Sequence, residues 1–247
     1  ALAGAANSAV AAYFAGGDGP RTTTVDKFAF PGDSRTTLGT GLPANTSDLT
    51  GAANSGVAAY FAGGVTTVRI DAVEKFAFSD DSRTTLGTGL SSARSGLGGA
   101  ANSGTAAYFA GGSGLVDTVD KFAFPGDGRS TLGTGLSSAR EYLAGAANSG
   151  TAAYFAGGTT GSKVTTVDKF AFSDDSRTTL GTGLATATDG LAGAADAAVA
   201  AYFAGGFGSI VATVDKFLFA DDSRTTLGTG LSSARAQPAG AADSGTL

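Results

Sequence analysis

Short apolar runs alternate with glycine-rich and polar turns along the whole chain, and the pattern returns about every 47 residues. Two segments recur five times without change. The segment Ala-Ala-Tyr-Phe-Ala-Gly-Gly places its tyrosines at Tyr13, Tyr60, Tyr108, Tyr154 and Tyr202. The segment Leu-Gly-Thr-Gly-Leu begins at Leu38, Leu86, Leu132, Leu180 and Leu227. Repetition at this period predicts an array of equivalent structural units.

Each unit contains four short β-strand candidates. In the first unit these are residues 4–8, 10–15, 24–30 and 35–42, separated by turn sequences such as Gly16-Gly17 and Pro31-Gly32-Asp33. No apolar stripe with helical spacing lasts ten residues, and glycine and threonine dominate, so we expect no helix. The pattern therefore predicts an all-β fold.

The side-chain alternation indicates that each sheet is covered on both faces. Phe28 and Phe30 share one face of the third strand, whereas Tyr13 and Phe14 point to opposite faces of the second strand. A radial blade between two neighbouring blades gives such cover. The Ala-rich first strand suits the narrow space near a central axis. We therefore predict a five-bladed β-propeller with four antiparallel strands per blade, whose Phe and Tyr ladders form the core between blades.

We expect residues 1–247 to form a single propeller domain. The expected units are residues 3–50, 51–98, 99–144, 145–192 and 193–239. The Gly-Ala-Ala segment occurs six times, so residues 240–247 are a spare first strand. Three explanations remain open: residues 240–247 complete the ring, residues 1–8 do so, or the chain is cut from a longer repeat array.

The order of these motifs resembles the kelch repeat. From the end of the second unit through the third, the pieces are Ser-Ser-Ala-Arg94, then Tyr108-Phe109-Ala110-Gly111-Gly112, then Val119-Asp120-Lys121-Phe122, then Leu132. The resemblance covers essentially the whole chain and implies a kelch-like propeller. One departure is the missing fourth-strand tryptophan, near whose place Arg35, Arg83, Arg129, Arg177 and Arg224 fall. The repeat sequence, with Asp-Lys-Phe-Ala-Phe followed by Leu-Gly-Thr-Gly-Leu, is also similar to the repeats of tandem-repeat proteins predicted in marine bacteria and tailed phages.

Composition narrows the function classes. The net charge is −5, and the sequence contains no Lys/Arg run, so we expect no nucleic-acid partner. No apolar stretch reaches the length of a membrane span, so we expect no membrane insertion. The absence of His and Cys removes the usual zinc ligands and thiol chemistry. We expect no cofactor and no metal site. The resemblance to repeat proteins of bacteria and phages implies an extracellular or virion-surface location.

The repeated charged residues have alternative interpretations. The acidic turns, such as Asp80-Asp81 and Asp174-Asp175, are either calcium ligands or turn residues that accept backbone N–H bonds, and the turn role is favoured. The five Arg after these turns either bind an anion or pair with the Asp two residues earlier or on the next blade. The same choice applies to Lys27, Lys75, Lys121, Lys169 and Lys216.

No catalytic arrangement is evident, because the chain has no His to act as a base and no Gly-x-Ser-x-Gly motif. The leading function is a non-enzymatic structural or adhesive binding module of a virion or cell surface, working within a larger assembly. The alternative is a lectin-like, carbohydrate-binding propeller, so the expected partner is a protein or a surface glycan. An enzyme domain is the third possibility, and it would require a cleft with residues that the other blades lack.

Antiparallel strands place the sequence variation on one face of the disc. Loops between strands two and three, and between successive blades, share that face and hold almost all the differences between units. We predict that this face contacts the partner. The candidate binding residues are Ile70, Leu115, Val116, Tyr142, Phe207, Ile210 and Val211.

Overall fold

The computed structural model describes residues 1–196, 198–207 and 210–240, which form five four-stranded antiparallel sheets. Blade 1 contains β1 (Ala3–Asn7), β2 (Ala11–Ala15), β3 (Val25–Ala29) and β4 (Ser34–Thr37). Blade 2 contains β5 (Thr50–Asn54), β6 (Ala58–Ala62), β7 (Val73–Ala77) and β8 (Arg83–Thr85). Blade 3 contains β9 (Gly98–Asn102), β10 (Ala106–Ala110), β11 (Val119–Ala123) and β12 (Gly128–Thr131).

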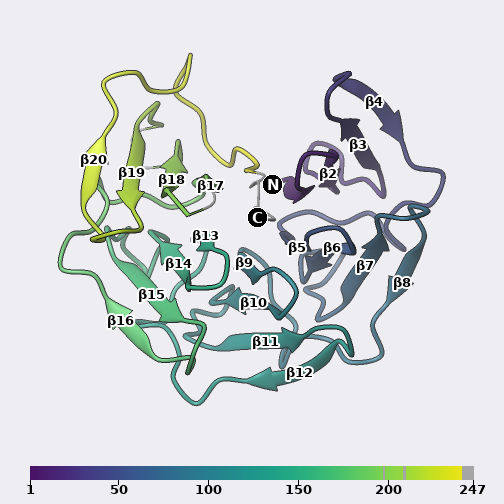
Figure 1. The fold of residues 1–247 in the computed structure, drawn as a ribbon, viewed down its shortest axis with the longest axis horizontal. Helices are drawn as coiled ribbons and strands as arrows, with labels where there is room; N and C mark the ends of the chain where they lie inside the picture. The colour runs from purple at the N-terminus through teal and green to yellow at the C-terminus, as the bar shows by residue number, and fades with distance from the viewer. Residues whose placement is uncertain (197, 208–209, 241–247) are drawn as a thin grey trace.

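The last two sheets repeat this order. Blade 4 contains β13 (Ala144–Asn148), β14 (Ala152–Ala156), β15 (Val167–Ala171) and β16 (Arg177–Thr179). Blade 5 contains β17 (Ala192–Asp196), β18 (Ala200–Ala204), β19 (Val214–Leu218) and β20 (Arg224–Thr226). In every blade the first strand lies near the central axis and the fourth at the rim (Figure 1). The fold is a five-bladed β-propeller, which confirms the predicted fold class.

The described residues contain no helix, and hence none long and apolar enough to cross a membrane. The strands match the predicted ones except at the fourth position. That strand ends at Thr37 in blade 1, five residues before the predicted limit at Leu42. The backbone turns inward there, because Gly41 lies against the carbonyl of Thr23 and the Leu42 amide donates to that carbonyl at 2.7 Å.

Glycines bring the first strands together at the axis. A Cβ on Gly51 would collide with the carbonyl oxygen of Gly4, and a Cβ on Gly99 would collide with that of Gly51. The same contact continues through Gly145, Gly193 and Gly240, and Gly4 in turn meets the Gly240 carbonyl. Only glycine permits this close approach of backbones. The axial ring therefore has six positions, of which the blades supply five and Gly240 the sixth.

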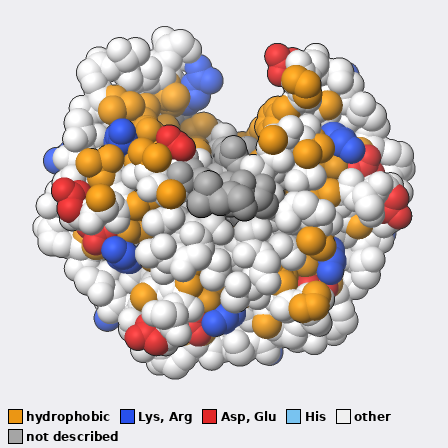
Figure 2. All heavy atoms as spheres, in the orientation of Figure 1, with side chains coloured by type: hydrophobic (Ala, Val, Ile, Leu, Met, Phe, Trp, Pro, Cys, Tyr) orange, Lys and Arg blue, Asp and Glu red, His pale blue; other side chains and the backbone are white. Residues whose placement is uncertain are grey.

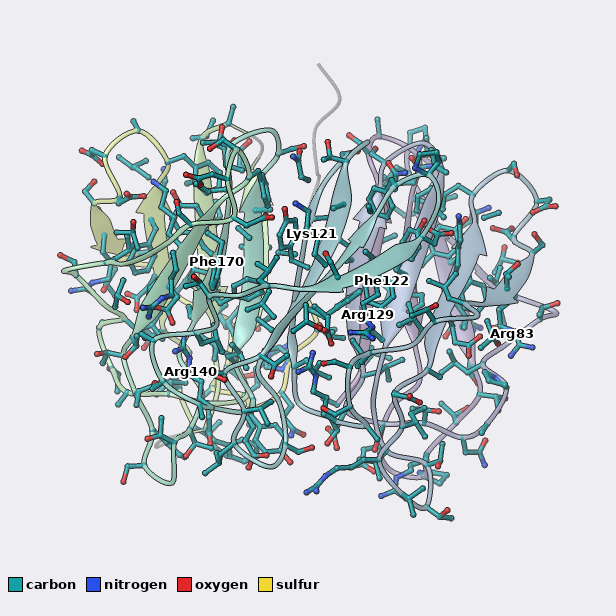
Figure 3. The ribbon with its side chains drawn as sticks, turned by 90° about the horizontal axis from the view of Figure 1, so that it is seen from below. Arg83, Lys121, Phe122, Arg129, Arg140 and Phe170 are labelled. Atoms are coloured by element: carbon teal, nitrogen blue, oxygen red, sulfur yellow. The ribbon has the colours of Figure 1, made fainter. Side chains whose placement is uncertain are left out.

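Aromatic ladders form the core between neighbouring blades, as predicted. Four hydrophobic clusters each join one blade to the next. The ring of Tyr108 lies 5.1 Å from that of Phe172 in the following blade, whereas Phe109 meets Phe122 of its own sheet edge-on at 5.7 Å. Figure 3 shows Phe122 and Phe170 midway between the two faces of the disc. Both are fully buried, and their burial supplies much of the hydrophobic stabilisation of each interface.

The repeated charges have structural roles. Asp80 accepts a backbone N–H bond from Ser82, as the turn interpretation predicted. Asp81, the next residue, instead binds the preceding blade, accepting hydrogen bonds from the Tyr13 hydroxyl at 2.6 Å and from Lys27 Nζ. This Tyr–Lys–Asp contact recurs at all four blade interfaces. The expectation that Lys pairs with the next blade is therefore confirmed for Lys27, Lys75, Lys121 and Lys169.

The expectation for the outer-strand arginines was wrong. Arg35 pairs neither with the Asp two residues earlier nor with the next blade, but with Asp26 on the adjacent strand β3, at 3.2 Å. The other four repeat this pairing within their own blades at 3.3–3.8 Å. The reason is the register, since Phe28 on β3 is paired with Arg35 on β4, and the guanidinium reaches the acid two residues away on that neighbouring strand.

The ring of blades is open between blade 5 and blade 1. Figure 1 shows the gap beside β17–β20 and β1–β4, and Figure 2 shows a notch there with hydrophobic side chains along both walls. Phe28 of blade 1 is 36% exposed, whereas its counterpart Phe122 in blade 3 is 0% exposed. Among the described residues, the four intact interfaces therefore have no equivalent between blade 5 and blade 1.

Candidate binding face and axial mouth

The loops divide between two faces as the strand order predicts. On one face, the loops between second and third strands lie beside the loops between blades, joined by isolated β-bridges such as Ser47–Val65 and Glu141–Thr159. On the opposite face, the β3–β4 turn binds the β1–β2 turn, and Phe30 donates its amide to the Val10 carbonyl at 2.7 Å. We call the first surface the variable-loop face.

A series of five backbone hydrogen bonds runs around the axis on the variable-loop face. The amide of Asp48 donates to the carbonyl of Ala1, Gly96 to Asp48, and Tyr142 to Gly96. Gly190 then donates to Tyr142 and Gln237 to Gly190. These six residues define the axial mouth: Ala1, Asp48, Gly96, Tyr142, Gly190 and Gln237. Behind it lies an axial cavity of about 150 Å³, lined mainly by Ala and Gly of the first strands.

The axial mouth requires a left-handed backbone, which explains its two glycines. Gly96 and Gly190 have φ of 63° and 59°. Tyr142 adopts φ of 56° at the equivalent position, and Asp48 and Gln237 do the same at 55° and 52°, although non-glycine residues rarely do so. Backbone strain of this kind concentrates at functional sites. Among the five equivalent positions, Asp48, Gly96, Tyr142, Gly190 and Gln237, Tyr142 alone carries an aromatic side chain.

Charged groups surround Tyr142. Burial raises the pKa of its hydroxyl, and the negative charges of Asp48 and Glu141 raise it further, while Arg69 opposes them. The hydroxyl therefore stays protonated at neutral pH and can donate a hydrogen bond. We call Asp48, Arg69, Glu141, Tyr142 and Asp189 the Tyr142 cluster. It combines an aromatic ring, a neutral hydroxyl and charges of both signs at one end of the axis.

A second aromatic group adjoins this cluster. Lys163 Nζ lies 3.3 Å from Asp189 Oδ1 and 5.7 Å from the centre of the Phe207 ring. Asp189 Oδ1 is buried and has no hydrogen-bond partner among the described residues. Phe207 is itself tied to the interblade loop, because its amide donates to the Asp189 carbonyl at 2.7 Å. These contacts hold an exposed aromatic ring beside a cation and an acceptor.

The seven predicted binding residues all lie on the variable-loop face but do not form one patch. Tyr142 lies at the axial mouth, with Phe207 near Gly190 and Gln237. Leu115 and Ile210 are exposed at loop tips, at 40% and 55%. The remaining three are half-buried: Ile70, Val116 and Val211.

Sequence reasoning missed several members of this surface. Val68 is 66% exposed beside Arg69, and Asp48, Glu141 and Lys163 complete the charged surroundings. These residues could have been found from the sequence, since each differs from its counterparts in the other units. They were missed because the predicted binding residues were chosen mainly for apolar character. The opposite face also exposes valines, at the repeated turn position of Val10, Val57 and Val199. Exposed apolar residues alone therefore do not distinguish the faces, whereas the Tyr142 cluster does.

Comparisons with known proteins identify the fold and no family. No protein-family model matches the chain, and no curated protein matches it. Among solved structures, YjhT superposes with a TM-score of 0.79 over 97% of this chain and 86% of the YjhT chain. The two sequences are 14% identical, so the likeness is one of fold. Function must therefore be argued from this chain's own residues.

Proposed function

We propose that the chain is a non-enzymatic binding module of a cell or virion surface, and that its variable-loop face engages a protein partner. The observation that carries this proposal is the Tyr142 cluster, where a bulky residue keeps a left-handed backbone amid charged neighbours. Loops on a rigid scaffold are the usual location of binding residues. The kelch-like repeat and the virion location rest on the sequence resemblance.

A binding role suits the chemistry of this surface better than catalysis does. The axial mouth does hold residues that other blades lack, which was the condition set for an enzyme domain. However, burial and the nearby acids raise the pKa of the Tyr142 hydroxyl, so this group is no base at neutral pH. An aromatic ring with donors and acceptors around it is a recognition surface.

A specific observation favours the lectin-like alternative. Phe207 is exposed beside the Lys163–Asp189 ion pair, which matches the requirement for polar groups next to an exposed aromatic. Among the described residues this arrangement occurs once, near blade 5, whereas a propeller lectin was expected to repeat it in most blades. We therefore rank the protein partner first.

The test compares both faces of the disc. Tyr142→Ala, and a triple variant Leu115→Ser, Phe207→Ser and Ile210→Ser, change the variable-loop face; Val10→Ser, Val57→Ser and Val199→Ser form the matched control. Val211 is left intact because it lines a small buried cavity with Leu184 and Phe203. Binding to bacterial envelope fractions is measured by biosensor, alongside circular dichroism to verify folding.

We expect binding that protease treatment of the envelope abolishes, that periodate treatment spares, and that only the variable-loop variants weaken, by at least about tenfold. Loss after periodate but not after protease would establish the lectin-like alternative. Equal binding by folded variants of both faces would contradict the proposal.

A further inference from the structure

The blades that border the opening expose residues that are paired at every other interface. Tyr154 and Lys169 of blade 4 bind Asp222 of blade 5 at 2.6 and 2.8 Å. Their counterparts in blade 5 are Tyr202 and Lys216. Within the described part of the chain, neither has a carboxylate from a following blade. Blade 5 therefore offers a hydroxyl and an ammonium group toward the opening.

Blade 1 carries the complementary half of this contact. Asp33 is the counterpart of Asp81 and Asp175 in the β3–β4 type of turn, and it has the same left-handed backbone. It is exposed, and its carboxylate has no partner among the described residues, whereas Asp175 binds Tyr108 and Lys121 at 2.7 and 2.8 Å. The acceptor on one wall of the opening thus matches the donors on the other.

A second ion pair, which joins blade 2 to blade 3 and blade 3 to blade 4, is divided in the same way. Arg140, in the loop after blade 3, is fully buried and binds Asp168 of blade 4 at 2.9 Å. Its counterpart after blade 5 is Arg235, which is exposed and, among the described residues, bonds only to serines of its own loop. The counterpart of Asp168 in blade 1 is Asp26, which is only half-buried.

The opening is one blade wide. Gly240 occupies the ring position between Gly193 of blade 5 and Gly4 of blade 1, with the same backbone contact to each that neighbouring blades make. The sequence from Gly240 also repeats the first-strand segment Gly-Ala-Ala-Asp found at Gly193. A second copy of this chain, with five blades, does not fit into a space of one.

We propose that the opening between blades 5 and 1 is the seat of a sixth blade of this same repeat, entered through Gly240. Its turn Asp would accept from Tyr202 and Lys216, and its own Tyr and Lys would donate to Asp33. Its third-strand Asp would bind Arg235, and the Arg at its end would bind Asp26. The exposed rings of Phe28 and Phe30 would then be covered as Phe122 and Phe124 are in blade 3. Charge complementarity and continuity with four existing interfaces carry this proposal.

The test supplies the missing unit. Residues 99–141 contain every required group, so a copy of them is joined after Ala239 in place of residues 240–247. Asp33→Ala and, as the matched control, Asp175→Ala are made in both the original and the extended chain. We expect the extended chain to unfold in one transition at a higher temperature. We also expect Asp33→Ala to lower that temperature by about 2–4 °C only in the extended chain, and Asp175→Ala to lower it in both.

A second measurement reports docking directly. The sequence contains no cysteine, so Phe28→Cys introduces a single thiol at the open edge. We expect its reaction with a maleimide to slow at least about tenfold in the extended chain, since a buried side chain is protected until the structure opens. Equal reactivity in both chains would overturn the proposal, whether or not the added unit folds.

The original chain tests whether a second copy of the protein covers the open edges. Its oligomeric state is measured by analytical ultracentrifugation with and without Asp33→Ala and Phe28→Ser. We expect a monomer in all cases. A dimer that these substitutions dissociate would mean that a second copy covers the edges, which would overturn the sixth-blade proposal and leave the proposed function of the variable-loop face untouched.

Discussion

Residues 27–33 of blade 1 and residues 121–127 of blade 3 have the same sequence, Lys-Phe-Ala-Phe-Pro-Gly-Asp, but different surroundings. In blade 3, Phe122 is fully buried, and Asp127 accepts from Tyr60 and Lys75 of the preceding blade at 2.8 and 2.6 Å. In the described part of the chain, no blade packs against this side of blade 1, and Phe28 is exposed. The comparison shows that a neighbouring blade, rather than the local sequence, determines what each of these residues contributes.

The largest expected difference concerns the phenylalanines. Phe122→Ala removes a fully buried ring and should lower the free energy of unfolding by about 3–5 kcal/mol. Phe28→Ala should cost about 1 kcal/mol or less, because its ring retains part of its contact with solvent. Urea unfolding of both variants measures the difference. A loss below about 1 kcal/mol for Phe122→Ala would mean that this position is not part of the core.

The interblade arginines give the next comparison. Burial alone would raise the pKa of Asp168, but hydrogen bonds from Thr179 and Ser137 and the charge of Arg140 hold it below its ordinary value. Arg140→Ala leaves this buried carboxylate without its cation and should cost about 3 kcal/mol. Arg235→Ala should change stability by less than about 0.5 kcal/mol, because that side chain is exposed. Similar losses in urea unfolding would contradict the distinction.

The tyrosine hydroxyls should show a smaller effect. Tyr154→Phe removes a hydrogen bond to Asp222, which keeps its bond from Lys169, so we expect a loss of about 1 kcal/mol. Tyr202→Phe should be nearly neutral, since its hydroxyl has no such acceptor in the described part of the chain. Thermal unfolding of the two variants in parallel provides the measurement, and equal shifts would argue against an open edge at blade 5.

Alkaline pH sharpens the same comparison. Burial and the hydrogen bond to Asp81 raise the pKa of Tyr13 to about 12, above the value of about 10 in an unfolded chain. Its stabilising contribution is therefore complete below about pH 10 and is lost as the pH rises toward about 12. Tyr13→Phe should reduce the decline of the urea midpoint across that interval. An unchanged decline would show that ionisation of Tyr13 does not contribute.

The sequence predicts most of the fold because its units are nearly identical. Strand order, strand number and the Phe and Tyr interfaces all follow from alternation within one unit and repetition of that unit. The length of the fourth strand does not, because the inward turn at Gly41 depends on contact with Thr23. The sixfold count of Gly-Ala-Ala was the one sequence signal of a ring with six positions, and it left three explanations open.

The candidate site was predicted only in part. Variation among units identified Tyr142 and Phe207, but the charged neighbours come from separate blades, and their meeting depends on the hydrogen-bonded axial mouth. Asp33 and Asp127 cannot be distinguished from their neighbours in sequence. Their difference arises from the blade that precedes each of them in space.

The most direct test of the open ring is a distance comparison. Because the chain lacks cysteine, pairs of spin labels can be placed at equivalent exposed positions of the fourth strands. Thr36→Cys with Thr84→Cys spans two adjacent blades, and Thr36→Cys with Thr225→Cys spans blades 1 and 5. The account predicts a clearly longer distance for the second pair in pulsed electron paramagnetic resonance. Equal distances would mean that the five blades close on themselves and would contradict it.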